Sequence, residues 1–486
     1  MDHLVSCFIL SGDGLEINRM VKDFRECPLI GKIFIITTGD VLSQEVDGAE
    51  IIRTAGLFSA SAMKQMAGHS GHAFTLFCNG TSPVRPGPWA VERMVQAAED
   101  TSAGMVYGDY YQVRENVLQP HPVIDYQEGS LRDDFNFGPM MLLRTDVLKK
   151  AAARMAAEWI YAGWYDLRLK ISQEAPVFRI PEFLCQSRVG ELRKAGEQQF
   201  DYVDPQNRAV QIEMEQACTL HLKDIGAFLE PEYRMTDLSV QDFEVEASVI
   251  IPVRNRASTI EDAVRSVLCQ VTDFTFNLLV ADNHSTDGTT EILQRLSTED
   301  KRIHLIIPDR SDLGIGGCWT LAVMDPRCGK FAVQLDSDDL YAGDDVLQRI
   351  VDTFYAERCA MVVGSYQMVN FRLEEIPPGI IDHREWTPGN GPNNALRING
   401  LGAPRAFYTP VLREIKGPHT SYGEDYALGL NISRHYQIGR IYDILYLCRR
   451  WEENSDASLD IVKMNAHNLY KDRIRTWELQ ARKNIK

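Results

Sequence analysis

Short runs of apolar residues alternate with amphipathic segments along the second half of the chain. The runs occupy residues 248–253, 277–281 and 331–335, and each ends on polar or acidic residues. Runs of this length predict strands that are buried on both faces, as in a parallel sheet. Residues 260–268, between the first two runs, place apolar side chains at helical spacing. The alternation of strands and helices predicts an α/β fold with a doubly wound, mostly parallel sheet.

The third run is followed directly by carboxylates, which places them at the end of the predicted strand. Asp336 and Asp338 are two residues apart, with Ser337 between them and Asp339 directly after. Open α/β sheets bind ligands at the carboxyl ends of their strands, and Mg²⁺ and Mn²⁺ prefer oxygen ligands. Because these cations keep positions open for substrate phosphates, the spacing predicts a cation that arrives with a phosphorylated substrate. The alternative interpretation is a helix N-cap at Asp338 or Asp339.

Four short motifs follow one another in the same half of the chain. They read Ile-Pro-Val-Arg-Asn at 251–255, Asp-Asn-His-Ser-Thr-Asp-Gly-Thr at 282–289, Asp-Ser-Asp-Asp at 336–339 and Gly-Glu-Asp-Tyr at 423–426. In this order the motifs resemble those of the family 2 glycosyltransferases. The resemblance extends over residues 246–458 and implies the GT-A fold of that family. It also implies transfer of a sugar from a nucleoside-diphosphate sugar with the help of a metal ion.

The resemblance implies a donor site along the first three motifs. The implied donor is a UDP-sugar, whose base lies near the first two motifs and whose diphosphate lies on a Mn²⁺ or Mg²⁺ ion. Asp338 and Asp336 would bind this cation, which acts as a Lewis acid on the departing diphosphate, and Asp336 would also contact the ribose. The other residues that the resemblance places around the nucleotide-sugar are Pro252, Val253, Asn255, Asp282, Asp287, Gly314, Ser337, Arg449 and Arg450.

The fourth motif supplies the implied catalytic base. A carboxylate must take the proton of the acceptor hydroxyl while the sugar is transferred. Asp425 is the first candidate and Glu424 the second, and the resemblance implies inversion by a single displacement. The acceptor is expected to be a glycan or a lipid-linked glycoconjugate. The alternative interpretation is that both acids stabilise a helix N-terminus through the helix dipole.

The chain departs from the family pattern around the donor site. Trp319 stands about where the family commonly has asparagine, and the segment after the fourth motif lacks the usual histidine. Glu453 or Asn454 is the expected replacement for that histidine. Arg449 and Arg450 are expected to hold the leaving diphosphate through bidentate hydrogen bonds, or else to pair with surface carboxylates.

The first half of the chain repeats the pattern of the second half. Residues 105–110 match residues 361–366, and residues 74–81 match residues 331–338 at nearly the same offset. A repeat of this kind predicts two tandem domains of the same GT-A-like fold. The predicted boundaries are 1–240 for a degenerate domain, 246–460 for the catalytic domain and 461–486 for an amphipathic helical tail.

The first copy has lost the residues that would bind a metal. Asn79 and Thr81 stand where Asp336 and Asp338 stand in the second copy. An amide and a hydroxyl are neutral, so they hold a hard dication poorly without a carboxylate. Asp166 falls near the position of the second copy's base. We therefore predict that the first copy is not catalytic and either packs on the active copy or helps to bind acceptor.

Composition narrows the class of protein without identifying a substrate. The 486 residues are 44% hydrophobic, and the net charge of -17 argues against nucleic-acid binding. The ten cysteines never form a Cys-x-x-Cys pair, which indicates reduced thiols rather than zinc ligands or a disulfide framework. The start of the chain lacks the features of a signal peptide, and no apolar run is long enough to span a membrane. We therefore expect a cytoplasmic enzyme.

The tail, residues 461–486, combines basic residues with apolar ones at helical spacing. A basic amphipathic helix can lie on an anionic membrane, which is where many lipid-linked acceptors are found. It can equally pack against the two domains. Both interpretations remain open, so peripheral contact with the membrane is one expectation for this protein.

Two other functions share some of these features. A non-catalytic protein that binds nucleotide-sugars or glycans would keep the fold but would need no base, so the Glu424-Asp425 pair argues against it. A nucleotidyltransferase would also use a parallel sheet and metal-bound aspartates. It would be expected to carry a glycine-rich, basic phosphate loop after the first strand, but residues 254–257 contain no glycine.

Overall fold

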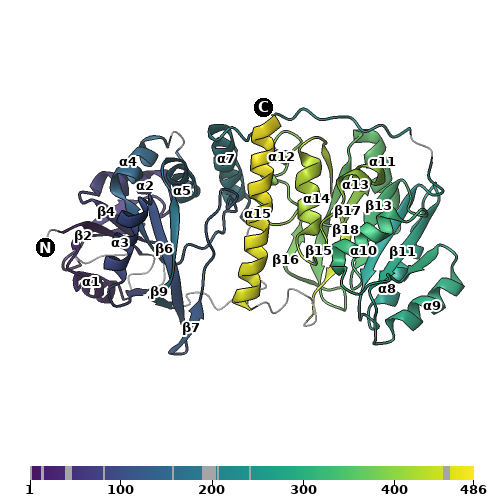
Figure 1. The fold of residues 1–486 in the computed structure, drawn as a ribbon, viewed down its shortest axis with the longest axis horizontal. Coiled ribbons are helices and arrows are strands. Elements are labelled where there is room, and N and C mark those ends of the chain that lie inside the picture. Colours follow the sequence, from purple (N-terminus) through teal and green to yellow (C-terminus); the bar gives the residue numbers. More distant parts are fainter. Residues whose placement is uncertain are drawn as a thin grey trace. The chain divides into compact units, whose positions relative to one another are not determined.

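Two sheets, one in each half of the chain, organise the fold (Figure 1). The computed structural model describes residues 3–11, 16–38, 46–79, 83–155, 158–188, 204, 207–239, 242–451 and 460–485. The described residues separate into two units. Unit 1 is drawn from residues 1–194, 209–227 and 460–476, and unit 2 is drawn from residues 195–208, 228–459 and 477–486.

Unit 1 contains a nine-stranded sheet. Its strands are β1 (Val5–Ser11), β2 (Ile30–Thr38), β3 (Glu50–Thr54), β4 (Phe74–Cys78), β5 (Val84–Pro86), β6 (Met105–Arg114), β7 (Val117–His121), β8 (Met140–Arg144) and β9 (Val177–Arg188). The helices that follow or connect them are α1 (Ile17–Arg25), α2 (Ala60–His69), α3 (Ala90–Thr101), α4 (Thr145–Ala153), α5 (Gly163–Glu174) and α7 (Arg208–Asp224). The strand order is β3-β2-β1-β4-β8-β6-β9-β5, and β7 pairs with β6.

Unit 2 contains a second nine-stranded sheet. Its strands are β10 (Ala247–Val253), β11 (Phe276–Asp282), β12 (Ile303–Ile306), β13 (Phe331–Gln334), β14 (Leu340–Tyr341), β15 (Met361–Val369), β16 (Glu375–Ile381), β17 (Arg405–Tyr408) and β18 (Ile438–Arg449). Its helices are α8 (Ile260–Leu268), α9 (Thr289–Glu299), α10 (Gly314–Met324), α11 (Val346–Glu357), α12 (Gly391–Asn394), α13 (Thr409–Ile415) and α14 (Glu424–Ser433). The strand order is β12-β11-β10-β13-β17-β15-β18-β14, and β16 pairs with β15.

The two sheets have the same topology, strand for strand in chain order. In the first sheet β1 to β4, β6 and β9 run in one direction, and β5, β7 and β8 run in the other. The second sheet repeats these directions, with β10 to β13, β15 and β18 against β14, β16 and β17. The prediction of two α/β sheets of mostly parallel strands, one in each half of the chain, is confirmed.

Buried parallel strands bring the acidic residues of unit 2 to one edge of its sheet. Every residue of β11 and of β13 is buried, in agreement with their mainly apolar sequence. β10 lies between them and pairs with both in parallel. The register places Val253 beside Asp282 and Ile250 beside Gln334, two residues before Asp336. The strand ends that carry the motifs therefore meet at the same edge.

The predicted tail forms the helix α15, Ile461–Ile485. Several of its basic side chains are buried and paired with acidic ones of the same helix. Arg475 donates to Asp472 at 2.8 Å, and Arg482 donates to Glu478 at 2.7 Å. These two guanidinium groups are fully buried, so they cannot contact lipid headgroups in this conformation.

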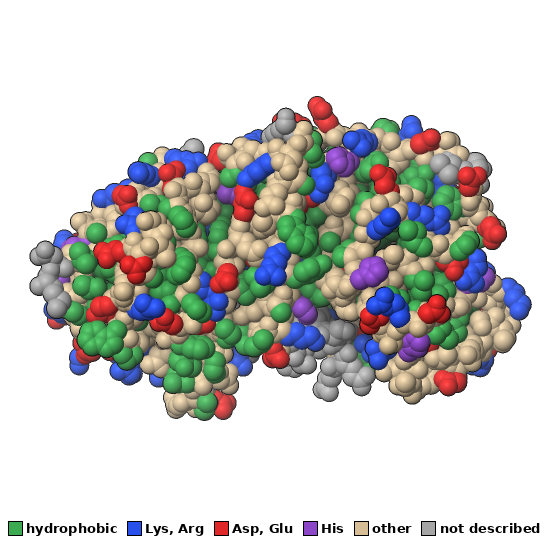
Figure 2. All heavy atoms as spheres, viewed as in Figure 1, with side chains coloured by type: hydrophobic (Ala, Val, Ile, Leu, Met, Phe, Trp, Pro, Cys, Tyr) green, Lys and Arg blue, Asp and Glu red, His purple; other side chains and the backbone are tan. Residues whose placement is uncertain are grey.

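Surface composition adds little to the choice of partner. On the face shown in Figure 2, acidic and basic side chains are interspersed among polar and hydrophobic ones. Within the described ranges, every helix is too short or too polar to cross a bilayer.

Candidate functional site

Asp336 lies just after the end of β13, where the sheet holds it in place. The Gln334 side chain donates to Asp336 Oδ1 at 2.8 Å, and the Asp336 backbone N–H donates to the Tyr446 hydroxyl at 3.1 Å. Burial raises the pKa of the Asp336 carboxyl, and the nearby charge of Asp338 adds to this effect, whereas Arg405 opposes it. The fold therefore places a carboxylate of restricted orientation at the strand end.

Asp338 and Asp339 continue this acidic run. The Trp451 indole N–H donates to Asp338 Oδ2 at 3.2 Å, and Arg256 Nε lies 3.8 Å from the same oxygen. Asp339 is buried and accepts a hydrogen bond from the Arg449 backbone N–H at 2.7 Å. Burial raises the pKa of Asp339 well above its ordinary value, and the charges of Asp338 and Asp336 raise it further.

The chemistry of this run fits a divalent cation that brings further ligands with it. The pKa values of Asp336 and Asp339 are raised by burial and by neighbouring carboxylates, which indicates an excess of negative charge that a dication would neutralise. Within the part of the chain that the structure describes, no three His, Cys, Asp or Glu side chains gather into a metal-binding group. Mg²⁺ is commonly held by one or two carboxylates together with substrate phosphates. The donor set therefore matches a cation shared with a phosphorylated ligand.

Arg405, the first residue of β17, connects this run to the acidic start of α14. Its Nη1 lies 3.0 Å from Asp425 Oδ2 and donates to the Gly402 carbonyl at 2.8 Å. Its backbone N–H donates to Gln334 Oε1 at 3.3 Å. Burial alone would lower the pKa of the Arg405 guanidinium, but the charges of Asp425 and Asp336 raise it. Arg405 is therefore a cation that both groups of carboxylates share.

Glu424, the first residue of α14, lies in a different electrostatic environment from Asp425. Burial raises the pKa of Glu424 to about 8, and the charge of Asp425 adds to the shift while Arg405 opposes it. Its Oε2 atom is buried and has no hydrogen-bond partner among the described residues. At neutral pH this carboxyl group is mostly protonated, whereas Asp425 is held in an ion pair.

Two glycines allow the segment before α14 to approach α10 closely. Gly314 has a φ of 62°, which favours glycine, and a Cβ there would lie 2.7 Å from Ser421 Oγ. Gly316 donates from its backbone N–H to the Thr420 carbonyl at 2.8 Å. A Cβ on Gly316 would lie 2.1 Å from the Pro418 carbonyl oxygen. Any larger residue at Gly316 must therefore displace the segment that positions Glu424.

The loops after β10 and β11 are joined by hydrogen bonds. Asn255, with a φ of 54°, accepts from the Thr286 backbone N–H at 2.8 Å. Asp287 accepts from the Ala257 backbone N–H at 3.0 Å and from the Thr289 hydroxyl at 2.6 Å. Burial alone would raise the pKa of Asp287, but these hydrogen bonds hold it below its ordinary value. Both predicted nucleotide contacts thus also shape the loop in which they lie.

The remaining predicted residues of the first three motifs lie at strand ends beside these loops. Asp282, fully buried at the end of β11, accepts from the Ser285 backbone N–H and from the Thr290 hydroxyl. Pro252 and Val253 end β10, and Val253 is buried. Ser337 is buried and its carbonyl accepts from the Thr259 hydroxyl at 3.0 Å.

Arg449 contacts the acidic run through its backbone N–H and at the Asp338 carbonyl. Its guanidinium is buried, donates to the Asp338 carbonyl and to Asp262 Oδ2, the latter at 2.9 Å, and lies 4.8 Å from the Phe371 ring centre. This matches the alternative in which the arginine pairs with a surface carboxylate. The Arg450 backbone N–H donates to the Val369 carbonyl. The predicted residues Thr81, Glu453 and Asn454 lie outside the described residues.

Sequence reasoning missed three residues that the structure brings to this site: Arg405, Tyr446 and Trp451. Arg405 could have been suspected, since it is a charged residue at the start of a short apolar run. Trp451 lies directly after the arginines that were considered. Tyr446 lies within a mainly apolar strand and carries no local signal of its role.

Comparison with known proteins identifies the family of this region. Residues 248–410 match the model of the family "Glycosyl transferase family 2". This match contains Asp336, Asp338 and Arg405, and it ends before Glu424. The chain therefore contains a family 2 glycosyltransferase domain.

Individual relatives match only part of their length. The succinoglycan biosynthesis protein ExoA of Rhizobium meliloti (strain 1021) is 32% identical over 124 residues, which cover 25% of this chain and 37% of that protein. An uncharacterized glycosyltransferase of Rickettsia felis is 27% identical over 301 residues, which cover 57% of this chain and 48% of that protein. The chain thus spans less than half the length of these curated relatives.

A solved structure of TarS from S. aureus, residues 1–349 in complex with UDP-GlcNAc, aligns with 49% of this chain and 72% of that chain. The sequence identity is 20% and the TM-score is 0.37.

We predict that Gly316→Ala destabilises unit 2. The added methyl group would meet the Pro418 carbonyl, and overpacking of this kind typically costs about 1–3 kcal/mol. Gly389→Ala is the matched control, because the nearest atom to its Cβ would be 3.8 Å away. Urea unfolding monitored by tryptophan fluorescence measures both variants. Equal stability of the two variants would contradict the close approach described here.

A second prediction concerns stability as a function of pH. Folding raises the pKa of Glu424 from 4.5 to about 8, so between these values the folded state holds a proton that the unfolded chain has released. This group therefore makes stability fall as the pH rises through that window. Glu424→Gln should match the wild type below pH 4.5 and be more stable above about pH 8. Urea titrations across this range measure the difference, with Glu414→Gln as the exposed control. Parallel curves for wild type and Glu424→Gln would refute the shift.

Proposed function

We propose that the family 2 domain of this chain, which includes residues 248–410, transfers a sugar from a nucleoside-diphosphate sugar to a hydroxyl group. We take the donor to be a UDP-sugar and the acceptor to be a glycan or lipid-linked glycoconjugate in the cytoplasm. One observation carries the proposal. Arg405 joins the acidic run that would face the diphosphate to the acidic pair that would face the acceptor.

The donor half of the site is built from the strand ends. Asp338 and Asp336 would hold Mn²⁺ or Mg²⁺, which when bound stabilises the negative charge that develops on the leaving diphosphate. Gln334 fixes the orientation of Asp336, and Trp451 fixes that of Asp338. Because these hydrogen bonds restrict both carboxylates before the donor arrives, less ordering is required on binding.

The loops after β10 and β11 form the proposed nucleotide cradle. Asn255 and Asp287 join the two loops, and Asp282 closes the end of β11. Pro252, Val253, Gly314, Ser337, Arg449 and Arg450 complete the proposed surroundings of the donor. Since Arg449 is buried against Asp338, we assign it to positioning of the acidic run.

The acceptor half of the site is the start of α14. Asp425 is the proposed base, because its ion pair with Arg405 holds the carboxylate in a fixed orientation. It takes the proton of the acceptor hydroxyl as the oxygen bonds to the anomeric carbon and the bond to the diphosphate breaks, which inverts that carbon. Glu424 is mostly protonated at neutral pH, so it serves as a hydrogen-bond donor rather than as the base.

Unit 1 is proposed to be non-catalytic. Its Asp166, the counterpart of the acidic pair, is fully buried and accepts hydrogen bonds from Trp159 and Lys170. A carboxylate enclosed in this way has no access to a substrate hydroxyl. Unit 1 is therefore assigned a supporting role, such as binding of acceptor.

The donor site is tested by calorimetric titration of UDP, GDP and dTDP with Mn²⁺ into the full chain. We expect one nucleotide, UDP, to bind only with the metal, and we expect Asp338→Asn to weaken this binding at least about tenfold, because it removes one charge from the cation site. Asp352→Asn, at an exposed acid of α11, is the control. Binding that needs no metal, or that Asp338→Asn leaves intact, would argue for another nucleotide site.

If Asp425 is the base, a substitution at Asp425 should lower turnover without weakening donor binding. Asp425→Asn should keep metal-dependent UDP binding but lower UDP release from a UDP-sugar by about 10²–10⁴-fold, the usual contribution of general base catalysis. The release assay uses water and added glycans as acceptors. If Asp425→Asn retains turnover while Glu424→Gln loses it, the roles of the two acids are reversed.

A further inference from the structure

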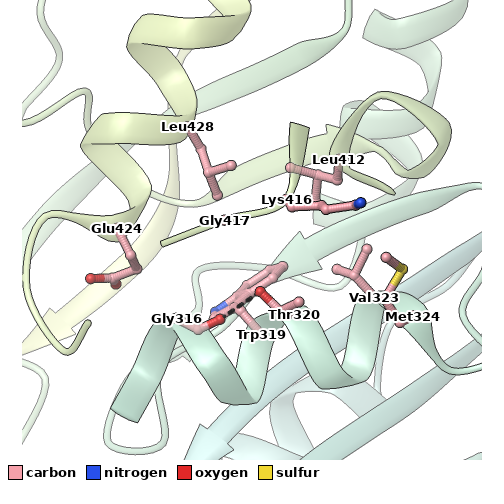
Figure 3. A pocket seen from close by; sticks show the side chains of 10 residues that line it. All are labelled: Gly316, Trp319, Thr320, Val323, Met324, Leu412, Lys416, Gly417, Glu424 and Leu428. Atoms are coloured by element: carbon pink, nitrogen blue, oxygen red, sulfur yellow. Dashed lines mark hydrogen bonds between the residues drawn. The ribbon is translucent and has the colours of Figure 1, made fainter. Parts of the chain in front are cut away.

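An elongated pocket in unit 2 runs from Glu424 along one face of α10 (Figure 3). Trp319, Val323 and Met324 line it from α10, at the spacing of residues that share one helix face. Leu412 from α13 and Leu428 from α14 form the opposite wall. The space between its walls, counted together with the part that is open to solvent, is about 370 Å³. Its lining residues on α10 extend from Gly316 to Met324, which is more than two turns, or about 12 Å at 1.5 Å per residue.

The walls of this pocket are mainly apolar, and the proposed donor site does not need apolar walls at this position. Pockets that bind small molecules are mostly apolar and contain a few polar groups that fix the orientation of the ligand. Trp319 forms a fixed part of the wall, because its ring packs edge to face on Phe407 with 5.9 Å between ring centres. Met324 is 46% exposed, so the pocket opens to solvent beside it.

The charged groups stand toward the two ends, and the Thr320 hydroxyl between them already donates to the Gly316 carbonyl at 2.9 Å. Glu424 lies at one end, and its buried Oε2 has no hydrogen-bond partner among the described residues. Because buried polar atoms are nearly always paired, this oxygen is available to a ligand hydroxyl. The exposed Lys416 lies toward the other end (Figure 3). A ligand that fits is therefore apolar along its length, with a hydroxyl at one end and a complement to an ammonium group at the other.

We propose that this pocket binds the apolar segment of an amphiphilic acceptor whose reactive hydroxyl lies at Glu424 and Asp425. This inference rests on the proposed transferase function and names the class of its acceptor. The apolar segment is an alkyl or aryl group attached to the part that bears the hydroxyl. An anionic group on the same molecule would pair with Lys416. The pocket thus selects acceptors by their apolar segment, whereas the cation site selects donors by their diphosphate.

The test compares n-octyl β-D-glucopyranoside with methyl β-D-glucopyranoside as probes. Both carry the same hydroxyl groups, and only the first has an alkyl chain that reaches along the pocket. Calorimetry uses the full chain with UDP and Mn²⁺ present and the octyl probe below its micelle concentration. Each buried methylene contributes about fourfold in affinity, so we expect the octyl probe to bind at least about tenfold more tightly.

Substitutions in the pocket test whether the tighter binding of the octyl probe arises there. Val323→Trp should fill the pocket and remove the preference, while Val271→Trp, at a position that is 67% exposed and outside the pocket, should leave it unchanged. Met324→Glu provides a second test that the fold should tolerate, because Met324 is half exposed. It should also abolish the preference by placing a charge beside the alkyl chain.

Failure of this inference is distinguishable from failure of the proposed function. Equal binding of the two probes, or a preference that survives both Val323→Trp and Met324→Glu, would overturn the pocket as the acceptor site while UDP still binds with Mn²⁺. Absence of metal-dependent UDP binding in the same samples would instead overturn the proposed function, on which the inference rests.

Discussion

The arrangement of unit 2 depends on one electrostatic constraint: several carboxylates lie around the cation Arg405, whose side chain is 17% exposed. Parallel strands bring Asp336 to one edge of the sheet, where its charge acts on Arg405, and α14 brings Glu424 and Asp425 to the same arginine. Burial and mutual repulsion raise the pKa values of Asp336 and Glu424, although the charge of Arg405 opposes both shifts. The remaining charge is the physical basis for expecting a dication and for assigning the two acids of α14 to different roles.

Close backbone packing places Glu424 beside an apolar pocket. Gly316 lets the segment before α14 lie against the start of α10, which fixes Glu424 relative to that helix. The same helix face then continues as the apolar wall that contains Trp319 and Val323. Glu424 and two walls of the apolar pocket are therefore held by one pair of elements, α10 and α14. Displacement of either helix would change the position of the base and the shape of the pocket together.

Local patterns were sufficient to predict the strands, the acidic run and the tandem fold, but not the contacts between them. Apolar runs identify buried strands such as β11 and β13, and the repeat of motifs indicated two sheets of one topology. Arg405 was not predicted, because its role arises from the antiparallel pairing of β17 with β13, which no local pattern specifies. The loop functions of Asn255 and Asp287 were also hidden, since a residue type that contacts nucleotides can equally make hydrogen bonds to a neighbouring loop.

The most direct test of the central claim is anomalous X-ray diffraction at the manganese edge from crystals of the full chain grown with UDP and Mn²⁺. If the carboxylates of the acidic run hold a cation together with the diphosphate, an anomalous peak will lie in bonding contact with Asp338, beside Asp336, and the diphosphate will share it. Manganese bound elsewhere, or UDP bound away from these carboxylates, would contradict the account of the acidic run as the donor site.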